Sequence, residues 1–281
     1  MSKIVHIADF YYPSVLGGGE LNNDELISLL QEKGFDVVVL KSGETSVDTL
    51  ENLKERHFII SNFIMLSAEC KEYLQNNCSY VIYEHDHKYL KNRNPAIYSN
   101  YVAPESEIIN KEFYKKAKQV LCQSLLHKSI MEKNLKINNI TSLSGNLWSV
   151  HTLRILRLLA KTPKTEKISI LDSPIEHKNT NSAVSYCILK NLSYEKIKSN
   201  DYHSFLEALS KNEKLLFIPK TPETLSRVVV EAKMMGVKVI TNKNVGASHE
   251  DWFSLSGGEL IDVMEQRRDQ IVNLVVKELH E

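Results

Sequence analysis

The sequence has little of what marks the specialised classes of protein. Its 35 basic and 35 acidic residues balance to zero net charge, and an apolar fraction of 42% is ordinary, so nothing indicates disorder. The cysteines form no C-x-x-C pair, which is typical of a reduced cytosolic protein with buried thiols (Cys70, Cys78, Cys122 and Cys187). No apolar run approaches the roughly 18 residues of a membrane span, and MSKIVHIADF predicts a strand rather than a signal peptide. We therefore expect a cytoplasmic protein.

One stretch, residues 214–241, indicates the architecture. A short apolar run at 215–218, closed by proline, predicts a buried strand. Apolar residues at i, i+3, i+4 and i+7 then predict a helix from about Glu223 to Gly236, and a second buried strand follows at 237–240. This is a strand–helix–strand unit of a parallel sheet. Open α/β sheets bind their ligands at the edge where the first strand of such a unit ends.

Two carboxylates, Glu223 and Glu231, stand eight positions apart in this unit. On a continuous helix they would differ by about 80° around the axis and about 12 Å along it. The helix dipole favours a charge at the N-terminus, whereas a carboxylate beside the apolar face needs a polar partner. From the spacing alone, a binding pair and a simple terminal charge plus a solvated glutamate are both possible.

A glycine loop follows the first predicted strand, residues 4–8. Gly17, Gly18 and Gly19 allow the backbone to approach a ligand closely, and the N–H groups at the mouth of the next helix suit a diphosphate. A plain flexible turn is the other interpretation of three glycines.

Polar residues also follow the strand predicted at residues 80–83. Glu84, His85, Asp86 and His87 suggest metal ligands at first, but no third His or Cys has a recognisable spacing, so we predict no metal site. Residues 80–167 hold about 15 Lys or Arg against about 7 Asp or Glu. The excess indicates either ordinary solvated helix faces or a surface for an anionic acceptor such as nucleic acid or a lipid phosphate.

The whole string P-x-x-x-E-x7-E-A-x-x-x-G-x-x-V-I at residues 219–240 resembles the nucleotide-binding signature of retaining glycosyltransferases with the GT-B fold, the "glycosyl transferases group 1" type. The G-G-x-E string at residues 17–20 resembles the N-terminal motif of the same clan. The resemblance implies an α/β protein with two Rossmann-like domains facing across a cleft. We expect an acceptor-side domain at 1–160, a nucleotide-sugar domain at 161–258, and a helix at 259–281 that packs back on the first domain.

The resemblance also implies residue roles. Glu223 would lie near the donor sugar and act in catalysis, and Glu231 would hold the ribose hydroxyls. The clan's G-R-x4-K-G motif is degraded: Asp172 and Ser173 replace the Gly and Arg, and Arg227 is a candidate to replace the lost cation. The implied donor contacts are Gly17, Gly18, Gly19, Lys178, Arg227, Glu231 and Gly246.

On the acceptor side the resemblance points to His85 or Asp86 as catalytic contacts. An imidazole at this position could orient or deprotonate a hydroxyl, and a structural hydrogen-bonding role is the alternative.

The implied activity is that of a hexosyltransferase-like enzyme. It would move a sugar from a UDP- or GDP-type nucleotide sugar to a hydroxyl of a glycan, lipid or small molecule, with retention, without metal and with no cofactor beyond the co-substrate. Two alternatives stay open: a glycosyltransferase acting on modified DNA bases, and a non-catalytic nucleotide-sugar-binding module, which Ser173 in place of Arg favours. A dinucleotide-dependent oxidoreductase is disfavoured because the first loop lacks G-x-G-x-x-G.

Overall fold

Two parallel β-sheets organise the chain, each at the centre of its own unit. The computed structural model describes residues 3–280. The first unit takes the chain up to Gln123, the segment His127–Leu143 and the chain from Arg268 onward. The second takes Ser124–Leu126 and Ser144–Arg267. Among the described residues, no helix has the length and apolar character to cross a bilayer.

The sheet of the first unit has six strands in the order β2-β1-β3-β4-β5-β6, all paired in parallel. Strands β1 and β4 are buried along almost their whole length, as expected of parallel strands covered on both faces. The strands are β1 (Lys3–Ala8), β2 (Asp36–Lys41), β3 (His57–Ile60), β4 (Tyr80–Glu84), β5 (Val120–Cys122) and β6 (Ile140–Ser142).

Two helices of the first unit, α2 and α3, begin at capping serines. The hydroxyls of Ser46 and Ser67 each accept a hydrogen bond from the backbone N–H three residues further along the chain, as N-cap serines do. The first helix instead begins directly within the glycine loop. These helices are α1 (Gly18–Glu32), α2 (Val47–Asn52), α3 (Ala68–Asn77), α4 (Lys111–Lys116) and α5 (Leu125–Leu135).

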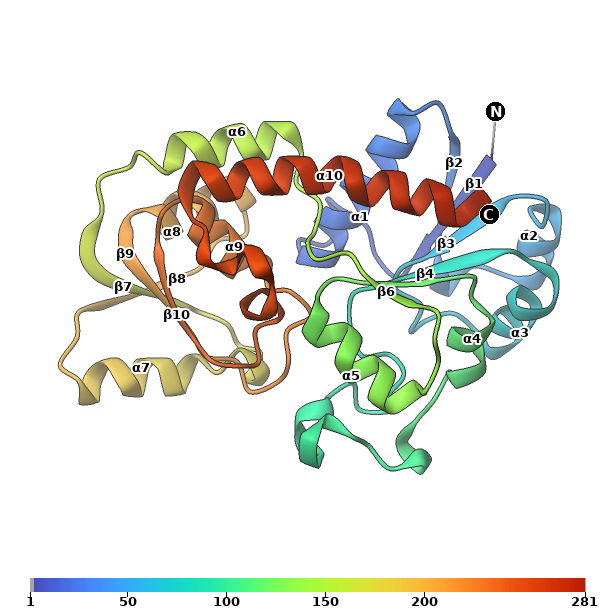
Figure 1. Cartoon of the computed structure of the whole chain (residues 1–281), viewed down its shortest axis with the longest axis horizontal. Coiled ribbons are helices and arrows are strands. Elements are labelled where there is room, and N and C mark those ends of the chain that lie inside the picture. Colours follow the sequence, from blue (N-terminus) through green and yellow to red (C-terminus); the bar gives the residue numbers. More distant parts are fainter. Residues whose placement is uncertain (1–2, 281) are drawn as a thin grey trace. The chain divides into compact units, whose positions relative to one another are not determined.

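The sheet of the second unit has four parallel strands in the order β10-β9-β7-β8, with α7 on one face and α8 and α9 on the other (Figure 1). A large apolar cluster lies on the α8–α9 face and a smaller one under α7. The elements are β7 (Thr165–Leu171), β8 (Tyr194–Ile197), β9 (Asn212–Phe217), β10 (Lys238–Thr241), α6 (Val150–Leu159), α7 (Thr180–Leu189), α8 (Tyr202–Ser210) and α9 (Arg227–Met234).

The division between the units falls after Leu143 and not after residue 160, where the sequence places it. Helix α6 belongs to the second unit because Leu153 and Leu156 are buried in the large apolar cluster with residues of α8 and α9. The last helix, α10 (Gly257–His280), starts in the second unit and ends in the first. Residue 281, which the sequence includes in this helix, lies outside the described residues.

Each sheet has one point at which its connections change direction. In the first unit β1 lies between β2 and β3, and in the second β7 lies between β8 and β9. The chain therefore leaves β1 and β3 toward opposite sides, and it does the same at β7 and β9. Such a switch point, at the carboxyl ends of the strands, is where open α/β sheets bind ligands.

Candidate functional site

The switch point of the second unit holds an ion pair between two residues singled out from the sequence. Lys178 ends the loop after β7, and Glu223 lies in the loop after β9. The Lys178 Nζ atom is 2.9 Å from both carboxylate oxygens of Glu223. Their side chains are 28% and 17% exposed, so both groups remain accessible. A cation and an anion thus meet where the fold favours a ligand.

The loop that carries Glu223 is fixed by backbone hydrogen bonds to the segment after β10. The Glu223 N–H donates to the carbonyl of Asn244 over 2.7 Å, and the Gly246 N–H donates to the carbonyl of Glu223 over 2.9 Å. A Cβ atom on Gly246 would collide with the backbone oxygen of Thr224. Glycine is therefore required at position 246 for the two loops to meet, and it holds Glu223 in place.

The helix of this unit begins later than the sequence indicates. Helix α9 starts at Arg227, so Glu223 lies outside it and the helical angle between Glu223 and Glu231 does not apply. Two features keep residue 223 out of the helix: it forms a parallel bridge with Val245, and Ser226 adopts a φ of 78° that interrupts the helix.

Glu231 lies in a buried polar cluster. Its Oε1 atom accepts hydrogen bonds from Trp148 Nε1 at 2.9 Å, from the Tyr202 hydroxyl at 2.6 Å and from Arg227 Nε at 3.3 Å. The guanidinium of Arg227 also stacks on the Trp148 ring, 4.5 Å from its centroid. Burial and the nearby Glu231 carboxylate raise the pKa of Tyr202, which therefore stays neutral. The Glu231 side chain is only 3% exposed.

Arg227 is thus committed to Glu231 and not to the diphosphate motif that it could complete. It also donates hydrogen bonds to the Leu147 carbonyl at 2.6 Å, the Tyr202 hydroxyl at 3.3 Å and Asn146 Oδ1 at 3.5 Å. Trp148 and Tyr202 were not identified from the sequence. Both come from elements distant along the chain, and no local pattern marks them as partners of a carboxylate.

In the first unit the glycine loop and His85 come together at the carboxyl edge of the sheet. Gly17 precedes α1 and its carbonyl accepts the first hydrogen bond of the helix, from Leu21 at 3.0 Å. A Cβ on Gly19 would lie 3.6 Å from the ring of His85. Gly18 is the first residue of α1. This glycine loop therefore allows the start of the helix to pack against the residue predicted to face the acceptor.

His85 is held at both ring nitrogens. The Gln123 amide donates to Nδ1 and Asn23 Oδ1 accepts from Nε2, each over 2.8 Å, so the hydrogen-bond network assigns the neutral Nε2–H tautomer. The ring also stacks on Tyr83. His85 is therefore firmly oriented, and it must exchange a hydrogen bond before its nitrogens can reach a substrate.

The neighbours of His85 point to separate partners. The carboxylate of Asp86 pairs with Arg93 at 3.1 Å, and His87 Nδ1 lies 2.8 Å from the Tyr89 hydroxyl. Glu84 is fully buried and bonds Lys88 and Tyr114, and burial raises the pKa of its carboxyl group. Within residues 3–280, no three His, Cys, Asp or Glu side chains are grouped to hold a metal ion.

Many cations of the basic segment are already paired within it. Six ion pairs lie within the segment: Lys88–Glu84, Lys91–Glu107, Arg93–Asp86, Lys111–Glu105, Lys115–Glu112 and Lys128–Glu132. These pairs use six of the seven acidic residues of the segment and leave nine of its 15 Lys and Arg outside them, so the positive excess counted along the sequence remains. Of those nine, Arg157 pairs with Asp262, which lies outside the segment.

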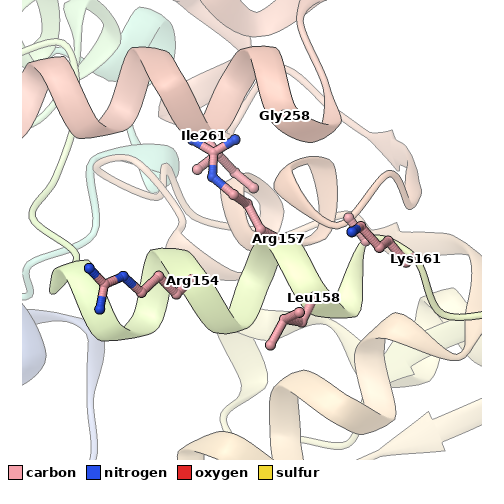
Figure 2. Close-up of a pocket in the computed structure, with 7 residues that line it drawn as sticks. Arg154, Arg157, Leu158, Lys161, Gly258 and Ile261 are labelled. Atoms are coloured by element: carbon pink, nitrogen blue, oxygen red, sulfur yellow. The ribbon is translucent and has the colours of Figure 1, made fainter.

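A hollow of about 520 Å³ lies in the second unit along α6, and Figure 2 shows Arg154, Arg157 and Lys161 arranged beside it. Leu158 and Ile261 give it an apolar lining. Arg157 bonds Asp262 and lies 3.5 Å from Glu265, so α10 neutralises one of the three cations that line the hollow.

Solved structures similar to this chain include a starch synthase and an α-glucosyltransferase. The chain resembles Anabaena Alr3699/HepE in complex with UDP and glucose, with 13% identity, a TM-score of 0.54, and coverage of 99% of this chain and 92% of that one. It also resembles the catalytic domain of starch synthase IV from Arabidopsis thaliana bound to ADP and acarbose, with 9% identity, a TM-score of 0.58, and coverage of 100% of this chain and 95% of that one. A third similar structure is an α-glucosyltransferase in complex with UDP and a 13-mer DNA containing an HMU base, with 11% identity, a TM-score of 0.50, and coverage of 98% of this chain and 91% of that one.

At these identities the similarity is one of fold, and it confirms the predicted α/β GT-B fold. No family model matches the sequence, and no curated protein matches it significantly.

Proposed function

We propose that the chain is a glycosyltransferase that moves a sugar from a nucleotide sugar to an acceptor hydroxyl. The observation that carries this proposal is the Lys178–Glu223 pair at the switch point between β7 and β9. Solved proteins of the same fold contain UDP or ADP, which supports a nucleotide ligand. We propose a UDP- or GDP-type donor and no cofactor beyond it.

The pair provides two complementary functions for a nucleotide sugar. Lys178 has three N–H donors, so it can bind a diphosphate oxygen and stabilise the charge that develops as the sugar leaves. Glu223 then becomes free to accept hydrogen bonds from hydroxyls of the donor sugar. Because a fixed cation and backbone N–H groups supply the positive charge, the proposed transfer needs no metal. We propose retention of configuration on the resemblance of residues 219–240 alone.

Glu231 is the proposed partner of the ribose hydroxyls. Its oxygen Oε1 already accepts three hydrogen bonds, so a ribose hydroxyl that bonds Oε1 has to displace a donor. Tyr202 is the natural group to yield, because it is uncharged and bonds through its hydroxyl alone, whereas Arg227 is a buried cation. In this proposal nucleotide binding exchanges a phenol for a ribose hydroxyl.

The first unit would bind the acceptor. His85 and Asp86 are the proposed contacts, with His85 as an orienting group rather than a free base, because Gln123 and Asn23 hold its two nitrogens. Glycans, lipids and small molecules all carry a suitable hydroxyl.

A thermal-shift series tests the donor site directly. UDP-, GDP-, ADP- and CMP-sugars are compared, and a ligand at 100 times its dissociation constant should add about 2.7 kcal/mol of stability. Lys178→Ala should weaken binding of a nucleoside diphosphate more than that of the nucleoside. Equal losses for both ligands would argue against a diphosphate contact.

Glu231→Gln is the appropriate variant for the ribose contact, because Glu231→Ala would leave the buried Arg227 unpaired and cost about 3–5 kcal/mol of stability. We expect Glu231→Gln to weaken nucleotide binding while the protein stays folded. Transfer or hydrolysis of the donor should persist in EDTA. Tight donor binding without turnover on any acceptor would instead support the non-catalytic module.

A further inference from the structure

The exposed apolar side chains of the first unit are concentrated in two loops. One loop joins β1 to α1 and the other joins β3 to α3, and each of the side chains concerned is 36–54% exposed. We call this set the apolar edge; it consists of Phe10, Tyr12, Val15, Leu16, Ile64 and Met65. Elsewhere in this unit the large exposed apolar residues are separated along the chain: Val39, Ile97 and Val102.

The two loops are joined through one buried carboxylate. Asp9 Oδ2 accepts a hydrogen bond from the Ile64 N–H at 3.1 Å, and Oδ1 accepts one from the Met65 N–H at 3.0 Å. Ser42, at the end of β2, also bonds Asp9. Met65 packs so closely on Gly43 that a Cβ there would lie 2.9 Å from its terminal methyl. The side chains after β1 and β3 therefore belong to one surface.

The first of these loops is anchored as well. The hydroxyl of Tyr11 bonds the carbonyls of His6 and Leu40 and contacts His6 Nδ1 at 2.9 Å. With Tyr11 fixed against the sheet, the flanking Phe10 and Tyr12 are presented to solvent. Ordered exposure of large apolar groups is a feature of binding surfaces rather than of ordinary loops.

Charged groups near the apolar edge are already engaged. Lys41 pairs with Glu44 at 3.1 Å, and Lys71 bonds Asn110 and lies over the Phe63 ring. Burial, reinforced by Asp9, raises the pKa of the Glu20 carboxyl group. An uncharged ligand segment complements this surface better than a phosphate does.

We propose that the apolar edge binds the alkyl chain of an amphiphilic acceptor, such as a single-chain lipid with a terminal hydroxyl group. The inference rests on the proposed function and names its acceptor class. The surface lies at the switch point between β1 and β3, beside the glycine loop, where a ligand of this unit is expected. Three of its six side chains are aliphatic, and a fourth is a flexible methionine that adapts to an alkyl chain.

The test compares two glucosides with the same head group by isothermal titration. Each buried methylene should tighten binding about 4-fold, so n-octyl β-D-glucoside below its micelle concentration should bind at least about 10-fold tighter than methyl β-D-glucoside. The double variant Ile64→Ser/Met65→Ser should remove this preference and leave UDP binding unchanged. Ile97→Ser, a control outside the apolar edge at a residue 61% exposed against 52% and 54% for Ile64 and Met65, should preserve the preference.

Three outcomes would overturn the proposal: no preference for octyl over methyl, an equal loss in Ile97→Ser, or phenyl β-D-glucoside binding as tightly as the octyl compound, which would indicate an aryl acceptor. Titration with UDP and with GDP separates this failure from that of the proposed function. Octyl binding without binding of either nucleotide would refute the glycosyltransferase and leave the alkyl site. Binding of UDP or GDP without an octyl preference would refute the alkyl site alone.

Discussion

Ser226 combines two features that normally destabilise a protein. Its φ of 78° lies in the left-handed region, and its buried hydroxyl has no hydrogen-bond partner among the described residues. Each is worth about 1–3 kcal/mol, whereas glycine adds back roughly 0.5–1 kcal/mol of unfolded-state entropy. We therefore expect Ser226→Gly to raise the free energy of unfolding by about 1–2 kcal/mol in urea denaturation.

A capping serine provides the contrast. The Ser149 hydroxyl accepts from Thr152 N–H at 3.0 Å at the start of α6, so Ser149→Ala should lower stability by about 1 kcal/mol. If Ser226→Gly proved no more stable than the parent protein, the strain assigned to residue 226 would be refuted.

His6 links stability to pH. Its Nδ1 faces the Tyr11 hydroxyl, its Nε2 faces Ser61, and burial lowers its pKa from 6.5 to about 3. Between those values the unfolded chain binds a proton that the folded protein does not. The contribution is therefore complete above about pH 6.5 and falls as pH drops toward 3, by about 1.4 kcal/mol per unit. At pH 4.5 the expected loss is about 2–3 kcal/mol.

Urea unfolding between pH 7.5 and 4.5 measures this dependence. His6→Gln should flatten the slope only in part, because burial also lowers the pKa of His127. The exposed His151 on α6 supplies the control, and His151→Gln should keep the parental slope. An unchanged slope in His6→Gln would show that His6 does not titrate as its burial requires.

At the scale of elements, the buried strands could be predicted from the sequence because their signal is local. The apolar runs of β1, β9 and β10 lie where the pattern predicted them. The start of α9 could not be predicted in the same way. It depends on the bridge between residues 223 and 245 and on the φ of Ser226, which are set by tertiary contacts.

In the candidate site too, residues with a local signal could be predicted and residues set by tertiary contacts could not. Lys178 and Glu223 could be anticipated, because each follows a predicted strand and the carboxyl ends of parallel strands meet at one edge. The partners that hold Glu231 and His85 had no such signal. Trp148 stands 83 positions from Glu231, and Asn23 stands 62 from His85. Asp9 differs, because its position directly after β1 could have indicated from the sequence that it lies at the carboxyl edge of the sheet.

At the scale of the whole molecule, the charge pairing bears on the DNA acceptor. With about six neutralised phosphates, affinity for DNA would fall roughly 10³-fold between 50 and 200 mM salt. Because the whole chain has zero net charge and six of the 15 cations of residues 80–167 are already paired with carboxylates, we expect no such binding in fluorescence anisotropy with duplex or single-stranded DNA. Binding with that salt dependence, reduced in Arg154→Gln/Lys161→Gln, would restore the DNA-modifying alternative.

The choice of lysines matters for that experiment. Lys88 and Glu84 are buried together, so Lys88→Gln should destabilise the fold by about 3–5 kcal/mol and confound any binding result. Lys91 forms an exposed pair with Glu107 at 3.7 Å, and Lys91→Gln should change stability by less than about 1 kcal/mol.

The path of the chain through its two units has a consequence for synthesis on the ribosome. Arg268 Nε of α10 bonds Glu25 of α1 at 2.9 Å, and the ring of His280 stacks on Phe35. The first unit therefore contains the beginning of the chain and a segment made only after residues 144–267. Domains generally fold as they emerge, N-terminal first. Here the unit that starts first cannot complete its packing until α10 has been made, so its contacts with α10 form only after residues 144–267 have been translated.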